Sequence, residues 1–231
     1  MLRTITLSLL GLLATSSLHA QHVSVGVKAG LNASTYSGED VPNPRFRLGP
    51  AAGVLVRLAL GKHLDLEPEL LYEQRGARTS YGNNYIGTSS TYQFTHQERS
   101  RLHYATLPVL VRLHGAKWFA VAGPQVSCLL SAQRHVTNAT ELLSGQQDPN
   151  IRLGYSTTTI RDASNYHRWE LGYAVGVGYQ VTARLGVELR YAAGVTQLHR
   201  ELLYDNLSTS RGEIASNGTL QAQVSYQLGT L

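Results

Sequence analysis

The chain has 231 residues and a formal net charge of +5, and its basic residues are scattered without a Lys/Arg-rich run, which argues against nucleic acid as a partner. Glycine is frequent at 22 residues, tyrosine outnumbers phenylalanine 13 to 3, and only 15% of the residues are charged. Such a composition is more typical of a membrane β-barrel than of a cytosolic enzyme. The single cysteine, Cys128, cannot form a disulfide within the chain.

The N-terminus has the features of a secretory signal peptide. Arg3 supplies a positive charge, residues 7–13 form a short apolar core, and residues 18–20 offer a cleavage site before Gln21. The core is too short to cross a bilayer as a helix, and no later stretch has the roughly 18 to 20 apolar residues that a helix needs. We therefore expect residues 1–20 to be removed and residues 21–231 to form one exported domain without a transmembrane helix.

Most of the remaining chain alternates with period two, which is typical of β-strands. Taken in chain order, the alternation predicts eight strands, at residues 23–32, 45–60, 64–75, 104–113, 118–130, 168–181, 185–195 and 219–228. The clearest pair is the hairpin at 168–195. Its bulky apolar residues share one face, and its other face alternates charged residues with Gly and Ala. A bulky apolar face suits lipid, and a charged face with small residues suits the narrow interior of a small closed barrel.

The predicted connections alternate between long and short. Polar segments precede residue 45 and occupy residues 76–101, 131–167 and 199–216, the third with a short hairpin extension near 151–160, whereas the other three connections are tight turns. Antiparallel strands then place every long loop at one rim and both termini at the other. We predict an all-β fold: an eight-stranded antiparallel up-and-down transmembrane β-barrel in the outer membrane, with four long surface loops and three short periplasmic turns. The first and last strands must pair, because lipid does not tolerate an unpaired edge.

Several motifs recur in order along the chain: Gly-x-Lys-x-Gly-x-Asn at residues 26–32, Pro-Glu-Leu-x-Tyr at 68–72, and the segments 104–108, 122–127 and 188–191. In these motifs the chain resembles the PorT-like outer-membrane β-barrel family of the Bacteroidetes. The resemblance covers nearly the whole mature chain. Two features depart from the family pattern: Ala105-Thr106 replaces a larger apolar residue and an acid, and the chain does not end on an aromatic residue. The resemblance implies a barrel in the outer membrane, folded with the help of the barrel-assembly machinery, and some family members are linked to protein secretion.

The predicted inward faces carry a nearly balanced set of acids and bases. These candidate site residues are Lys28, Arg57, Asp65, Glu67, Glu69, Glu73, Arg75, Arg112, Glu170, Glu188 and Arg190. An eight-stranded barrel is just wide enough for side chains to fill it, and buried charges are normally paired. We interpret the set as a structural salt-bridge network that fills the lumen, with a narrow conduit or a proton-linked site as the alternative. Glu67 and Glu69 could also form an acid/base dyad, but nothing else in the sequence builds a substrate pocket beside them.

The sequence favours a non-enzymatic protein with a structural or interaction role through its surface loops. We expect no catalytic residue, metal or cofactor, since His96, His103 and His114 form only a loose set and no nucleophile motif is present. The expected partners are outer-membrane lipid, the assembly machinery, and a protein or glycan at the loops. The alternatives are a small porin-like or secretion-associated barrel, a soluble lipocalin-like ligand-binding barrel with an apolar lumen, and a lipid-modifying enzyme in which Ser, His and an acid meet at one rim.

Overall fold

The computed structural model describes residues 23–37, 43–87, 90–148, 151, 153–164, 166–196 and 216–230. The expected signal peptide, residues 1–20, lies outside them. Over these ranges the chain forms ten strands and no helix: β1 (Val23–Ser37), β2 (Arg47–Ala59), β3 (Leu64–Arg75), β4 (Arg78–Ile86), β5 (Ser90–His114), β6 (Trp118–Gly145), β7 (Gly154–Ile160), β8 (Trp169–Gln180), β9 (Leu185–Gly194) and β10 (Ser216–Thr230). None of the described residues belongs to a helix that could span a membrane.

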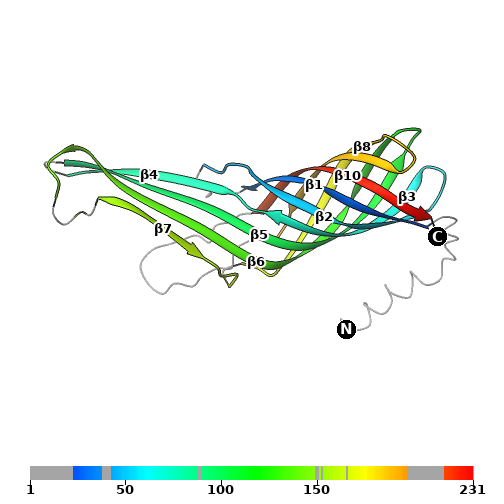
Figure 1. The fold of residues 1–231 in the computed structure, drawn as a ribbon, viewed down its shortest axis with the longest axis horizontal. Coiled ribbons are helices and arrows are strands. Elements are labelled where there is room, and N and C mark those ends of the chain that lie inside the picture. The colour runs from blue at the N-terminus through cyan, green and yellow to red at the C-terminus, as the bar shows by residue number, and fades with distance from the viewer. Residues whose placement is uncertain are drawn as a thin grey trace.

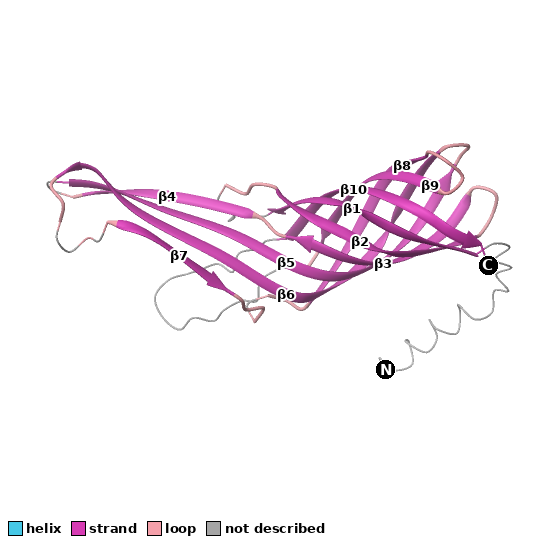
Figure 2. Ribbon diagram, viewed as in Figure 1, coloured by secondary structure: helices cyan, strands magenta, loops and turns pink. Residues whose placement is uncertain are grey.

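Eight of the strands close into a ring. Their order is β1-β2-β3-β5-β6-β8-β9-β10, every neighbouring pair is antiparallel, and β10 pairs with β1 to complete the barrel (Figure 1). This confirms the predicted eight-stranded barrel and the pairing of its first and last strands. The three tight turns, the start of β1 and the end of β10 lie at one rim, here called the turn rim (Figure 2). The opposite rim, from which the longer connections leave the ring, is called the long-loop rim.

Two connections expected to be irregular loops are instead largely strand. Residues 76–101 contain β4 and the first part of β5, and residues 131–167 contain the end of β6 followed by β7. β4 pairs with β5, and β7 pairs with β6, within the range where a hairpin extension was expected. Together β4, residues 90–101 of β5, residues 133–145 of β6 and β7 form a four-stranded sheet, here called the extension. It projects from the long-loop rim well beyond the barrel (Figure 2).

The outer wall of the barrel carries an apolar band with aromatic residues at both edges. Trp118 packs edge-on against Tyr179 at the turn end, and Trp169 stands opposite Cys128 toward the long-loop end. The two levels are about ten residues apart along β6, which corresponds to roughly 25 Å along the axis of a barrel with tilted strands. That height matches the apolar belt of outer-membrane barrels, and aromatic girdles commonly flank it.

The interior holds side chains from every strand of the ring. Phe119 and Val121 point inward and are buried. They belong to an apolar cluster on one wall, made up of Leu110, Phe119, Val121, Ala174 and Ala192. A second apolar cluster lies at the long-loop end and consists of Tyr36, Ala77, Leu102, Tyr104, Leu129, Ala132 and Tyr166. Charged and neutral polar residues occupy the remaining interior.

Candidate functional site

All eleven charged residues singled out from the sequence lie on the inner face of the barrel. Ten of them are buried, and Arg57, near the turn rim, keeps about a tenth of its side chain exposed. Their positions follow from strand alternation: β3, for example, buries its odd-numbered residues from Asp65 to Arg75 and turns the even-numbered ones outward. The structure therefore brings together side chains that lie up to 162 residues apart in sequence, because the ring places their strands around one narrow space.

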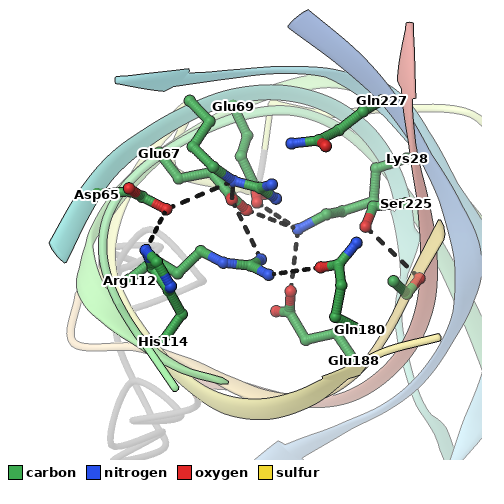
Figure 3. A network of polar contacts seen from close by, with 12 residues as sticks. Lys28, Asp65, Glu67, Glu69, Arg112, His114, Gln180, Glu188, Ser225 and Gln227 are labelled. Carbon is green, nitrogen blue, oxygen red and sulfur yellow. Dashed lines mark hydrogen bonds and ion pairs between the residues drawn. The ribbon is translucent and has the colours of Figure 1, made fainter. Parts of the chain in front are cut away.

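Lys28 is the centre of the first group of contacts. Its Nζ lies 2.5 Å from Glu69 Oε1, 3.1 Å from Glu188 Oε2 and 3.3 Å from Glu67 Oε1. Figure 3 shows the ammonium group inside the ring, with these carboxylates reaching it from the surrounding wall. One cation thus neutralises part of the charge on three carboxylates, which come from β3 and β9.

Arg190 joins two opposite walls of the barrel. Its Nη1 and Nη2 each donate to a Glu69 oxygen at 2.9 Å, and its Nε donates to Glu188 at 2.6 Å. β9, which carries Arg190, and β3, which carries Glu69, have three strands between them in either direction around the ring. A bidentate pair of this kind is the strongest form of side-chain ion pair and fixes the geometry of both partners. The lumen is therefore crossed at its full width by one salt bridge.

A second group lies nearer the turn rim. Glu67 accepts from Arg57 Nε at 2.9 Å and from Arg112 Nη1 at 3.4 Å. Arg112 also donates to Gln180 Oε1 at 3.0 Å, and its guanidinium stacks 3.4 Å above the Phe119 ring. At the mouth itself, Asp65 contacts Arg57 and the ring nitrogen of His114, beside a cavity of about 200 Å³.

A third group, toward the long-loop end, is centred on Arg75. This residue pairs with Glu73 on its own strand and with Glu170 on β8, the latter at 2.8 Å. Its guanidinium also lies 5.1 Å from the centre of the Tyr104 ring, which belongs to the apolar cluster at that end. The apolar cluster thus packs directly on the charged network.

Neutral polar residues complete this third group, and they were not among the site residues predicted from the sequence. Glu73 accepts from Thr106 at 2.9 Å and from Gln221, and Glu170 accepts from Asn217 at 2.5 Å. Ser127 accepts from Arg75 Nη2 at 3.3 Å. All four sit at inward positions of their strands, so the alternation of the sequence already places them in the interior. They were missed because only charged residues were predicted to form the network.

The arrangement leaves the carboxylates paired. Each of the six acids lies within salt-bridge distance of at least one cation. Glu67 and Glu69 both contact Lys28, so neither is an unpaired carboxylate free to act as a base. Pairing with good hydrogen-bond geometry is what allows charges to be buried at all. The dyad considered from the sequence has both members fully enclosed, where a substrate does not reach them.

The histidines noted in the sequence remain apart. His96 stacks on Tyr81 and hydrogen-bonds Asn138, His103 bonds the Tyr72 hydroxyl, and His114 contacts Asp65. Across the described ranges, no three His, Cys, Asp or Glu residues are grouped so as to hold a metal ion.

Comparison with known proteins agrees with this architecture. The sequence model of the outer membrane protein β-barrel domain matches residues 19–200, which is most of the chain. The chain belongs to this outer-membrane β-barrel family. Membership places the barrel in the outer membrane, in agreement with its apolar outer wall. None of the curated proteins compared with the chain matches it.

Solved structures similar to this outer-membrane β-barrel include Neisserial surface protein A (NspA), at 13% identity and a TM-score of 0.38, covering 88% of this chain and 97% of that one. The attachment invasion locus protein Ail of Yersinia pestis has 8% identity and a TM-score of 0.38, covering 89% and 98%. The outer membrane protease OmpT from Escherichia coli has 10% identity and a TM-score of 0.27, covering 93% and 99%.

Proposed function

We propose that this protein is a non-enzymatic outer-membrane barrel that is closed to passage through its lumen and acts through the surface it exposes at the long-loop rim. The observation that carries this proposal is the bidentate pair between Arg190 and Glu69, which joins opposite walls. A small porin-like barrel needs a continuous water-filled path. Here the side chains of Lys28, Glu69 and Arg190 are each 1% exposed or less.

The energetics of the network support a structural role. Removing one partner of a buried ion pair strands the other charge and typically costs about 3–5 kcal/mol. A barrel that used these groups to move ions or protons would need to break such pairs in each cycle. Filling the lumen with mutually paired side chains instead gives a single packed interior and ties β1, β3, β8 and β9 together.

Two alternatives fit the contacts less well. A lipocalin-like barrel would have an apolar lumen and a polar outer wall, whereas this barrel has charges inside and exposed residues such as Leu171 and Val177 outside. A lipid-modifying enzyme of the kind considered would need a Ser, a His and an acid together. The ring nitrogens of His96, His103 and His135 instead bond the side chains of Asn138, Tyr72 and Thr159.

The extension supports the interaction part of the proposal. Its outer strand β7 is exposed along its whole length, and its residues are mainly Gly, Ser, Thr and Tyr. Such residues make adaptable polar contacts, and binding groups are commonly carried on segments that project from a rigid barrel. We propose that the long-loop rim faces the cell exterior, that the extension offers a site for a protein or glycan there, and that the short turns face the periplasm.

We propose that the chain is exported and then inserted into the outer membrane by dedicated machinery. The signal peptide at residues 1–20 would direct export, and the barrel-assembly machinery would insert the folded domain. The motifs at residues 26–32 and 68–72 support membership in the PorT-like barrel family of the Bacteroidetes.

Site-directed labelling tests which side of the membrane the extension occupies. In a Cys128→Ser background, Ser156→Cys puts a thiol on the exposed strand β7, and Lys117→Cys puts one in the β5–β6 turn. A membrane-impermeant maleimide added to intact cells should label the first variant and reach the second only after the outer membrane is broken. Labelling of the Lys117→Cys variant in intact cells, with Ser156→Cys protected, would overturn the proposed orientation.

A further inference from the structure

The base of the extension contains a cavity lined by four arginines. Its volume is about 630 Å³, and Arg47, Arg78, Arg99 and Arg101 line it together with the apolar side chains of Phe46 and Leu48. We call it the arginine cavity. It lies where β2 begins, where β4 leaves the barrel, and where β5 crosses from the extension into the ring.

Three of the four arginines, Arg78, Arg99 and Arg101, lie on the same side of the sheet as the lipid-facing wall. Arg99 and Arg101 continue the outward alternation of β5 that includes Leu107 and Val109. Arg78 stands directly opposite Arg99 on β4, so it shares that face. His103, whose ring hydrogen-bonds the Tyr72 hydroxyl, lies on β5 between the apolar band and the arginines. Arg101 is the next outward residue of β5 beyond it. The cavity therefore sits immediately beyond the edge of the band.

The charge of the cavity is unbalanced. Its lining contains no Asp or Glu, and in the described ranges none of the four arginines forms a salt bridge. Arg47 Nη1 is buried without a hydrogen-bond partner, and Arg47 Nη2 reaches only the amide oxygen of Gln74 at 3.4 Å. The nearby acid Glu98 points to the opposite face, where it contacts Arg134. Like charges placed opposite one another are unfavourable, and guanidinium groups are well suited to phosphate oxygens. The cavity thus has the chemistry of an anion site.

The apolar residues at the cavity indicate what kind of anion would fit. Phe46 is 65% exposed and Leu48 68% exposed, both line the cavity, and Leu48 belongs to the outward, lipid-facing residues of β2. On the other side, a second cavity of about 260 Å³ shares Arg99 with the first and is lined by hydroxyl groups, including those of Thr137 and Tyr155. A ligand that matches all three surfaces has acyl chains, anionic groups and sugar hydroxyls.

We propose that the arginine cavity binds the phosphorylated sugar headgroup of an outer-leaflet glycolipid, with the acyl chains lying along Phe46 and Leu48. The choice of the outer leaflet rests on the orientation given under the proposed function. The binding chemistry is independent of that orientation, so it is tested on purified protein in detergent, in the absence of a membrane. A failure of binding is then distinct from a failure of topology.

The experiment is a lipid titration followed by native mass spectrometry of the folded protein in a non-ionic maltoside, without phosphate buffer. The probes are bis-phosphorylated lipid A, its monophosphorylated form and its dephosphorylated form. We expect affinity to fall in that order. The variant Arg78→Gln/Arg99→Gln/Arg101→Gln should bind the bis-phosphorylated probe at least about tenfold more weakly, because it loses charge-assisted hydrogen bonds. Heat-dependent gel mobility shows whether it is folded; if it is not, Arg99→Gln alone should still weaken binding about threefold.

A matched control separates a site from general attraction between opposite charges. Arg134→Gln/Arg161→Gln/Arg184→Gln removes the same charge from positions outside the cavity and should change affinity by less than about twofold. Equal losses in both triple variants would overturn the proposal.

The apolar wall and the anion source have their own tests. Phe46→Ser/Leu48→Ser should weaken lipid A binding while leaving any displacement by inorganic phosphate unchanged. Tighter binding of a sulfated soluble oligosaccharide than of lipid A, or full displacement of lipid A by millimolar inorganic phosphate, would show that the site serves soluble anions and would overturn the lipid assignment.

Discussion

Replacing Arg190 by Met tests whether the lumen network holds the barrel together. Met approximates the length of the Arg stem but carries no charge. The substitution removes two bonds of 2.9 Å to Glu69 and one of 2.6 Å to Glu188. Both carboxylates then depend on Lys28, which already contacts Glu67. One negative charge is left without compensation in a closed space.

The expected loss follows from that stranded charge. Breaking a buried ion pair by removing one partner costs about 3–5 kcal/mol, and Arg190→Met should lower the free energy of unfolding by that amount. Adding Glu69→Gln removes the uncompensated charge, so the double variant should recover at least about 1 kcal/mol of the loss. Recovery by a second substitution is specific to coupled charges, since two independent packing defects would add.

The assay is urea unfolding in detergent micelles, followed by tryptophan fluorescence and by the gel shift between folded and boiled protein. Arg184→Met is the matched control, because Arg184 lies exposed in the β8–β9 turn. A free energy of unfolding for Arg190→Met within about 1 kcal/mol of the unmodified protein would refute a stabilising role for the network, as would a further loss on adding Glu69→Gln.

Three further predictions concern the barrel wall. A methyl group on Gly53 would overlap a carbonyl oxygen of β3, so Gly53→Ala should lower the free energy of unfolding by roughly 2 kcal/mol in the same assay. Gly61→Ala, which places its methyl group in open space, should leave it unchanged, and equal effects of the two substitutions would contradict the close approach of β2 and β3. Trp118 and Trp169 should each be quenched most by lipids brominated near the headgroup, and strong quenching only by bromine at the chain ends would contradict their placement at the edges of the band. A tryptophan at Val175, in a background lacking the native ones, should show the reverse depth dependence, since this exposed residue lies between the two edges.

The sequence predicted the ring because each of its strands meets lipid on one face and a polar interior on the other. That contrast imposes period-two alternation, and the tight turns fix which strands are neighbours. The extension escaped prediction for the same physical reason. β4 and β7 are exposed to water on both faces, so Thr, Ser, Asn and Tyr occur on either side and no alternation remains. Their pairing with β5 and β6 is long-range information that composition does not carry.

The candidate site divides in the same way. Alternation was sufficient to select all eleven inward charges, but not their partners. That Arg190 meets Glu69 depends on strand tilt and on the three strands between β9 and β3, which no local pattern specifies. Asn217 and Gln221 could not be predicted as site residues, because a neutral amide has no distinguishing pattern in the sequence and its role depends on the carboxylate beside it. The four arginines of the arginine cavity come from three strands, and sequence alone does not place them together.

Single-channel recording in planar lipid bilayers tests the closed lumen most directly. Folded protein, checked by heat-dependent gel mobility, would be inserted from detergent and held at both polarities in concentrated potassium chloride. We predict no steady open-channel current, because the salt bridge between Arg190 and Glu69 crosses the whole interior and Lys28 occupies the space beside it. A stable, ohmic current from the unmodified protein would contradict the closed lumen and the function proposed from it.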